Sequence, residues 1–291
     1  MDRLWSGGAF NWSVAATEPR AGRDPDGAAL IWEGEDGGIT RLTNGELLDQ
    51  VQRAAAMLAG LGVAGGDRVG LLLPLLPEAV ISVLALGRLG AIFTPIFSGY
   101  GAPAVASRLT ACGARLLITA DGTLRRGAVV ALKQVADEAL ALAPGVERLL
   151  VVRRLGERAG DIPWEVERDA WWHEQMAEPG IRPLIHAPVT DPATPYMIIH
   201  TSGTTGRPKG AVHVHGGFPI KGAQDMAHGL DVRAGDRVSW LTDLGWMMGP
   251  WLISGSLLLG ATLVLTEGSR DWPGPDRTWA VAARHGITRW V

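Results

Sequence analysis

Thirteen residues, 200–212, hold the side chains of this chain that are best suited to chemistry; they read HTSGTTGRPKGAV. The glycines lack the Cβ atoms that would keep a backbone away from an anion, and the hydroxyl side chains supply donors beside the main-chain N–H groups. Lys209 adds a full positive charge. The apolar residues 196–200 predict a short buried strand that leads into this loop. The candidate phosphate-binding residues are Thr201, Ser202, Gly203, Thr204, Thr205, Gly206 and Lys209.

The loop is not a Walker A motif. That motif, GxxxxGK[ST], needs a Gly before its Lys and a hydroxyl residue after it to hold Mg²⁺. Here Pro208 precedes Lys209 and Gly210 follows it. The pattern therefore excludes a P-loop kinase or GTPase. A flexible surface turn is the alternative for any cluster of glycine, serine and threonine.

The loop resembles, at every specified position, the phosphate-loop motif [ST]SG[ST]TGxPKG of the adenylate-forming (AMP-binding) superfamily. Further segments resemble acetyl-CoA synthetase-like enzymes of that superfamily, and they occur in the same order. Residues 5–11 resemble WFxGGxLN, residues 29–34 ALIWEGE, residues 66–79 GDRVxIYMPMIPEA, residues 118–126 ITADxxxRxGR and residues 241–246 TADxGW. Several dispersed matches in order are more specific than any one of them.

The resemblance implies an α/β fold, namely the N-terminal domain of an adenylate-forming enzyme, with two lobes of mostly parallel sheet flanked by helices. It also implies an AMP-forming acyl-CoA synthetase, an acid–thiol ligase that acts on a small carboxylate such as acetate with ATP, Mg²⁺ and coenzyme A. Lys209 would be the catalytic residue of this chain. The family's adenine segment, its ribose-binding Asp and its mobile C-terminal domain with the adenylation Lys are expected beyond residue 291. We therefore expect an incomplete, inactive N-terminal fragment.

The resemblance places Trp246 and Met247 at the acyl pocket. A role in the hydrophobic core is the alternative for Trp246, because large aromatic side chains dominate cores. Acetate-using relatives have small or hydroxyl residues after the pocket Trp, whereas this chain has two methionines, which fill irregular apolar space. The sequence therefore leaves the identity of the acid open.

The resemblance also suggests a CoA site. Arg125 aligns with an arginine that contacts the CoA phosphates, and Arg126 would substitute for a second arginine, at whose position Ala128 stands. A solvated surface position is the alternative for both arginines. Met248 and Asp271 stand where the family has a CoA-contacting Thr and Asn. These two departures leave the details of CoA binding open.

The composition restricts the possible partners, the cellular location and the metal content of the protein. The net charge of −3 is spread along the chain, so we expect no nucleic-acid partner. The single cysteine, Cys112, excludes an intrachain disulfide and fits a cytoplasmic location. Residues 244–266 are uncharged but interrupted by glycine and proline, so we expect buried structure there and no membrane span. The histidines show no metal-ligand spacing, and no protein metal site is expected. Nothing here predicts the oligomeric state.

Strands and helices that alternate along the chain must position these residues. Near-continuous apolar strands separated by helices predict a parallel sheet covered on both faces. We expect a first lobe in residues 1–190, with an irregular opening and an irregular connection at 153–194, and a second lobe in residues 191–291. A helix is expected near residues 213–228, with His213 and His215 as polar groups at its start. Thr43 and Glu46 predict a capping box.

Two other functions remain open. A non-catalytic nucleotide-binding module would keep the phosphate loop and bind ATP without acid-dependent chemistry. An adenylate-forming enzyme that loads a carrier-protein thiol instead of CoA would share the first reaction step. The segments that flank the loop favour the CoA branch.

Overall fold

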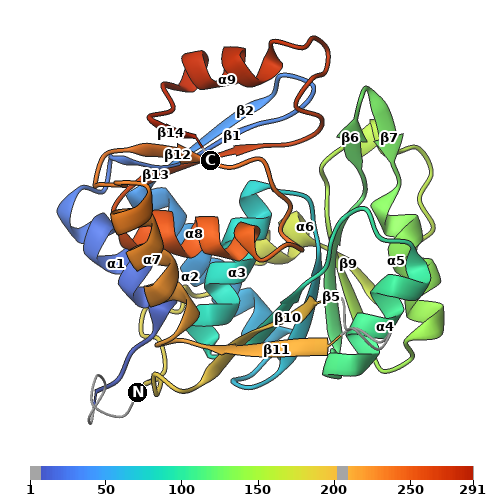
Figure 1. Ribbon diagram of the computed structural model, residues 1–291. Helices are drawn as coiled ribbons and strands as arrows, with labels where there is room; N and C mark the ends of the chain where they lie inside the picture. Colours follow the sequence, from blue (N-terminus) through green and yellow to red (C-terminus); the bar gives the residue numbers. More distant parts are fainter. Residues whose placement is uncertain (1–7, 202–208, 291) are drawn as a thin grey trace.

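The computed structural model describes residues 8–201 and 209–290, and in this part of the chain two large sheets enclose a layer of helices (Figure 1). The larger sheet has seven described strands in the order β11 (Lys209–Val214), β10 (Pro195–Thr201), β4 (Ile92–Pro95), β3 (Arg68–Leu72), β5 (Leu116–Ala120), β8 (Arg148–Val152) and β9 (Asp169–Trp171). All neighbours are parallel except the pair β10–β11. Its central strands are apolar because both faces are covered; all five residues of β5 are buried.

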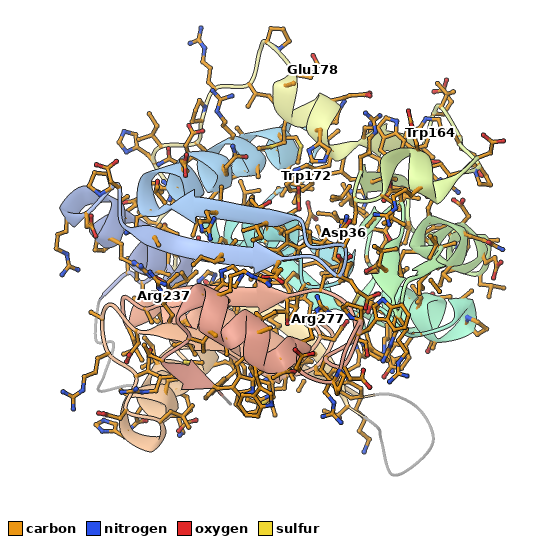
Figure 2. All side chains as sticks on the ribbon, turned by 90° about the horizontal axis from the view of Figure 1, so that it is seen from above. Asp36, Trp164, Trp172, Glu178, Arg237 and Arg277 are labelled. Atoms are coloured by element: carbon orange, nitrogen blue, oxygen red, sulfur yellow. The ribbon has the colours of Figure 1, made fainter. Side chains whose placement is uncertain are left out.

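The smaller sheet has five strands in the described residues, in the order β14 (Arg289–Trp290), β12 (Arg237–Ser239), β13 (Thr262–Thr266), β1 (Ala28–Glu33) and β2 (Ile39–Thr43). It is parallel except for the hairpin β1–β2 at its edge. Figure 2 shows Asp36, at the tip of this hairpin, and Arg277 at the same end of the sheet. The fold class expected from the sequence is thus confirmed.

The helices form three layers around the sheets (Figure 1). Between the sheets lie α1 (Trp12–Arg23), α2 (Asn44–Gly60), α3 (Pro77–Leu89), α7 (Phe218–Gly229) and α8 (Met248–Leu258). The outer face of the larger sheet is covered by α4 (Ala102–Cys112) and α5 (Leu132–Leu142), and that of the smaller sheet by α9 (Arg277–His285). Every residue of α3 except Glu78 is buried, as expected for a helix with neighbours on all sides.

Local sequence signals set several helix ends. Thr43 Oγ1 accepts a hydrogen bond from the N–H of Glu46 at 3.1 Å, and Glu46 Oε2 accepts one from the N–H of Thr43 at 2.8 Å. This confirms the predicted capping box at the start of α2. Helix α3 begins with Pro77 at a tolerated position and ends at Gly90, whose φ of 73° is accessible to glycine without strain.

The sequence predicts an irregular opening, but this prediction is wrong for residues 12–23, which form α1. The Asn11 side chain accepts hydrogen bonds from the N–H groups of Ser13 and Val14, which caps the helix. Trp12 and Ala16 are buried and anchor α1 in the core. Pro19 lies inside α1, where tertiary packing outweighs the one backbone hydrogen bond that the proline removes.

The expected helix at residues 213–228 is also wrong in its first part. His213 ends up in β11, which pairs with β10, and α7 begins only at Phe218, with Pro219 in its first turn. His215 is buried and is not a cap-region group. Residues 153–194 likewise contain more structure than expected, namely a 3₁₀ turn (Gly156–Ala159), β9 and the short helix α6 (Trp172–Ala177).

Each sheet contains strands from both sides of residue 190. β10 and β11 follow that residue, yet they extend the larger sheet beside β4. β1 and β2 precede it, yet they pair with β13 in the smaller sheet. The expected lobes 1–190 and 191–291 therefore do not each contain one sheet. Parallel pairing needs long crossover connections, and these bring distant segments of the chain into one sheet.

His215 is buried between the start of α1 and the Tyr196 ring. Its Nδ1 accepts a hydrogen bond from the N–H of Trp12 at 3.3 Å, and its ring lies 5.4 Å from that of Tyr196. Burial lowers the pKa of His215 from 6.5 to about 4, because the charged imidazolium would lose its hydration. The folded protein therefore keeps His215 neutral at pH values where the unfolded chain binds a proton.

We expect the free energy of unfolding to decrease as the pH falls from 6.5 toward 4. In that window only the unfolded chain takes up the His215 proton, which is worth ~3 kcal/mol for a shift of this size. Urea denaturation of the wild type and of His215→Gln, at neutral pH and at about pH 4.5, measures this loss of unfolding free energy. The wild type should lose more stability than the variant. Equal losses would contradict a neutral, buried His215.

Candidate active site

A cavity of about 560 Å³ lies where strands of both sheets end. Its walls come from residues 74–75 after β3, 97–99 after β4, 123–126 after β5, 241–246 after β12 and 266–271 at the end of β13. Ligands of open α/β sheets bind outside the carboxyl ends of parallel strands. The cavity occupies this position with respect to both sheets at once.

The segment after β12 forms one wall and carries Trp246, which is half-exposed and lies 5.2 Å from Phe97 between ring centroids. Asp243 holds this segment: it accepts hydrogen bonds from the Ser98 hydroxyl at 2.6 Å and from the N–H of Gly245 at 2.8 Å. A Cβ atom on Gly245 would lie 2.0 Å from the backbone nitrogen of Phe97, so only glycine fits. Burial raises the pKa of Asp243, and these hydrogen bonds oppose the shift.

A second wall is the hairpin of β6 (Thr123–Arg125) and β7 (Ala128–Val130). Its turn residues, Arg126 and Gly127, have φ values of 53° and 76°, as a two-residue type I′ turn requires. Residues 266–271, at the end of β13, form a third wall. Arg126 Nη2 lies 2.7 Å from Oδ2 of Asp271 in this wall. Arg125 is exposed. A hydrogen bond from Ser269 and the charge of Arg126 lower the pKa of Asp271, which therefore stays ionised.

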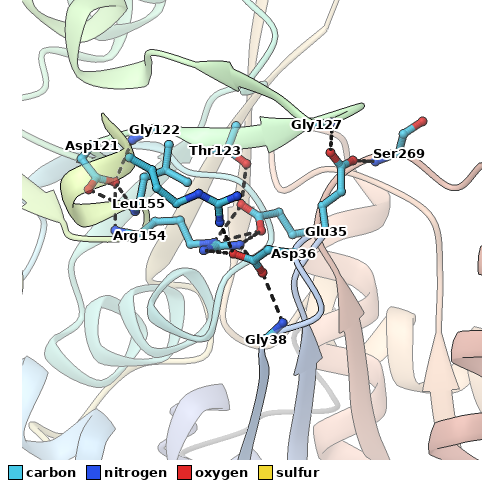
Figure 3. A network of polar contacts seen from close by, with 12 residues as sticks. Glu35, Asp36, Gly38, Asp121, Gly122, Thr123, Gly127, Arg154, Leu155 and Ser269 are labelled. Carbon is cyan, nitrogen blue, oxygen red and sulfur yellow. Dashed lines mark hydrogen bonds and ion pairs between the residues drawn. The ribbon is translucent and has the colours of Figure 1, made fainter. Parts of the chain in front are cut away.

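A buried ion-pair network lies beneath these walls (Figure 3). Glu267 accepts a hydrogen bond from the Thr123 hydroxyl at 2.6 Å and three from the Arg154 guanidinium, the shortest at 2.5 Å. Arg154 also pairs with Asp36, at the tip of the β1–β2 hairpin, at 3.1 Å. The backbone N–H of Arg154 donates to buried Asp121 at 2.9 Å. The Arg154 guanidinium thus joins the segment after β13 to the tip of the β1–β2 hairpin, and the Arg154 backbone N–H adds the segment after β5.

The predicted phosphate loop begins where β10 ends. β10 is parallel to β4, so the chain leaves the larger sheet at the edge where the cavity lies. Thr201 and Lys209 pair across the hairpin β10–β11, and the Thr201 hydroxyl donates to the Lys209 carbonyl at 3.5 Å. Lys209 is exposed, and no acidic side chain in residues 8–201 and 209–290 pairs with its ammonium. Ser202, Gly203, Thr204, Thr205 and Gly206 lie outside the described residues.

Four of the sequence-predicted residues meet in the cavity: Trp246, Arg125, Arg126 and Asp271 all line it. Met247 and Met248, at the start of α8, do not. Trp246 is not a core residue, so the alternative interpretation of it is wrong.

Sequence reasoning missed Asp243 and Glu267, which line the cavity, and Glu35, which supports it. Asp243 lies inside the segment that resembles TADxGW, and an acidic residue two positions before Gly-Trp, after a strand, is a signal that could have identified it. Glu267 directly follows the apolar run of β13, where an ionisable residue at a strand end could also have been noted.

No group of three or more His, Cys, Asp or Glu side chains in the described ranges is arranged to hold a metal ion. No helix there is long and apolar enough to cross a membrane.

The AMP-binding enzyme family matches residues 17–291, which is nearly the whole chain and includes both sheets. This chain is a member of the AMP-binding enzyme family. The family predicted from the loop and its flanking segments is thus confirmed.

Relatives in this family include the acetyl-coenzyme A synthetases of Gemmatimonas aurantiaca and Pyrobaculum arsenaticum. They are 42% and 43% identical over 98% and 89% of this chain. The acetoacetyl-CoA synthetase of Streptomyces lividans has a similar structure, with a TM-score of 0.87 and 31% identity over 96% of this chain. The chain spans 44%, 40% and 42% of these three proteins, respectively, less than half of each.

Proposed function

We propose that this chain is the ATP- and acid-binding part of an AMP-forming acyl-CoA synthetase. The observation that carries the proposal is the position of the cavity. Strands of both sheets end around it, and β10, which the predicted phosphate loop follows in the sequence, ends at the same edge. Membership of the AMP-binding enzyme family and the names of the relatives support it.

The proposed reaction has two steps. A carboxylate oxygen attacks the α-phosphorus of ATP, which gives an acyl-adenylate and pyrophosphate. The thiol of CoA then attacks the acyl carbon and displaces AMP. Neither step needs a nucleophile from the protein, so the chain would contribute positioning and charge stabilisation.

Lys209 would neutralise the charge that develops on the departing pyrophosphate, because its ammonium is exposed and has no acidic partner among the described residues. The loop residues from Thr201 to Gly206 would supply the remaining donors, and ATP would enter as its Mg²⁺ complex. A metal carried by the phosphates fits the described residues, which offer no acidic or histidine cluster of their own.

Trp246 would contact the acyl group from the cavity wall, with Met247 next to it in the chain. Arg125 and Arg126 would bind the phosphates of CoA. Met248 and Asp271 are further candidates for CoA contact, and Asp271 would act through its ion pair with Arg126.

Acetate or another small carboxylate is the proposed acid, because the relatives are named for acetyl and acetoacetyl products. We place the reaction in the cytoplasm and expect no nucleic-acid partner, in line with the spread of charge along the chain.

Exchange of labelled pyrophosphate into ATP tests the proposal. The complete product of the gene that encodes this chain should catalyse exchange only when a suitable acid is present. Acetate, propionate, butyrate and longer acids form the test series, and the acid that supports the fastest exchange identifies the substrate. An absence of exchange with every acid would reject the proposed function.

A further inference from the structure

Glu35 joins two walls of the cavity. Its Oε1 accepts a hydrogen bond from the N–H of Gly127 at 2.7 Å, and its Oε2 accepts one from the N–H of Ser269 at 2.6 Å (Figure 3). Gly127 is in the β6–β7 turn, beside Arg126, and Ser269 is two residues before Asp271. One carboxylate thus connects both segments whose side chains form the Arg126–Asp271 pair.

The Glu35 site is built to hold a carboxylate. The side chain is only 1% exposed, and Arg277 Nη1 lies 3.9 Å from Oε2. Arg277 also donates to the carbonyls of Ser269 and Glu267, at 2.5 and 2.8 Å, so it holds the same segment from the other side. A Cβ atom on Gly268 would lie 2.2 Å from Glu35 Oε2, so the backbone approaches the carboxylate as closely as glycine allows.

We infer that Glu35 is a positioning residue that sets the affinity of this cavity for CoA, an inference that rests on the proposed function. Glu35 does not line the cavity and acts through the backbone of its walls. By fixing Gly127 it holds Arg125 and Arg126 in place for the CoA phosphates. By fixing Ser269 it holds Asp271, which keeps Arg126 in position.

The variant Glu35→Gln tests the inference in the complete gene product. A glutamine amide offers one acceptor oxygen, and its NH₂ group cannot accept the second backbone N–H, so one wall is released. We expect the KM for CoA to increase about tenfold, as for the loss of one hydrogen bond to a charged group. The KM for ATP, the KM for the acid and the exchange rate should change by less than about twofold. A merely structural role would not raise the KM for CoA alone.

Glu33→Gln is the matched control. Glu33 is the last residue of β1, two positions before Glu35, and is also buried, but its side-chain partners are Arg284 and His285 of α9 and it does not line the cavity. This variant should lose stability and keep the KM for CoA. The shorter Glu35→Asp keeps the charge but cannot reach both walls, and it should give an intermediate KM even if Glu35→Gln does not fold.

The outcomes separate this inference from the proposed function. If the wild type shows no acid-dependent exchange, the proposed function fails. If the wild type forms acyl-CoA and the folded Glu35 variants keep its KM for CoA, the function stands and the positioning role of Glu35 is rejected. An equal increase of the KM in Glu33→Gln would also reject it, because the effect would then be one of general stability.

Discussion

Replacing Lys209 by Ala is expected to lower acid-dependent exchange of pyrophosphate into ATP by roughly tenfold to a thousandfold, as for the loss of one charge-stabilising donor. Lys209 begins β11 and faces Thr201 across the hairpin, so the two residues flank the predicted loop. Its ammonium is exposed and free of acidic partners within the described ranges. Exchange assays on the complete gene product would measure the effect, and kcat should fall more than the KM for ATP rises.

Lys221→Ala is the control for this prediction. Lys221 is also an exposed lysine, so its replacement by Ala changes the net charge by the same amount. Its side chain pairs with Asp225, one turn further along α7. Exchange by this variant should equal that of the wild type. Full exchange by Lys209→Ala would remove Lys209 from the mechanism without affecting membership of the family.

Arg154→Ala is expected to give the largest loss of stability, ~3–5 kcal/mol in the free energy of unfolding, because it leaves a buried charge without its partner. The Glu267 side chain is fully buried and would keep only the Thr123 hydroxyl as a donor among the residues described here. Asp36 would keep its pair with Arg158. Urea denaturation of the wild type and the variant measures the difference.

Two further variants control for this loss. Arg153 precedes Arg154 in the chain, but its pair with Glu174 is exposed, so Arg153→Ala should cost less than about 1 kcal/mol. Adding Glu267→Gln to Arg154→Ala removes the unpaired charge and should restore part of the lost stability. A loss below about 1 kcal/mol for Arg154→Ala itself would mean that water or another side chain compensates Glu267.

Local signals predicted most of the elements. The strand and helix at residues 68–89 were predictable because a buried parallel strand is a continuous apolar run, and because Pro77 and Gly90 set the ends of α3. The mostly parallel sheets also followed from the alternation of such runs. In contrast, α1 was hidden by Pro19, and the second strand of the β10–β11 hairpin resembled the start of a helix.

The site was predictable only where a motif marks it. The segments around Arg125 and Trp246 resemble family motifs, and both reach the cavity. The contacts of Glu35 with Ser269 and of Arg154 with Glu267 join residues more than 100 positions apart. No local pattern reports such pairs, because they arise from strand order, which mixes segments from both sides of residue 190.

The exchange of labelled pyrophosphate into ATP, with and without acid and before any CoA is added, distinguishes an acyl-adenylate-forming enzyme from a protein that only binds ATP. The complete gene product should show exchange with acetate or another small acid and none without acid. Addition of CoA should then yield acyl-CoA and AMP in equal amounts. ATP binding without exchange in the presence of any acid would contradict the proposed acyl-CoA synthetase function and favour a nucleotide-binding module. If exchange occurs but no acyl-CoA forms after CoA is added, the result would favour an enzyme that loads a carrier protein.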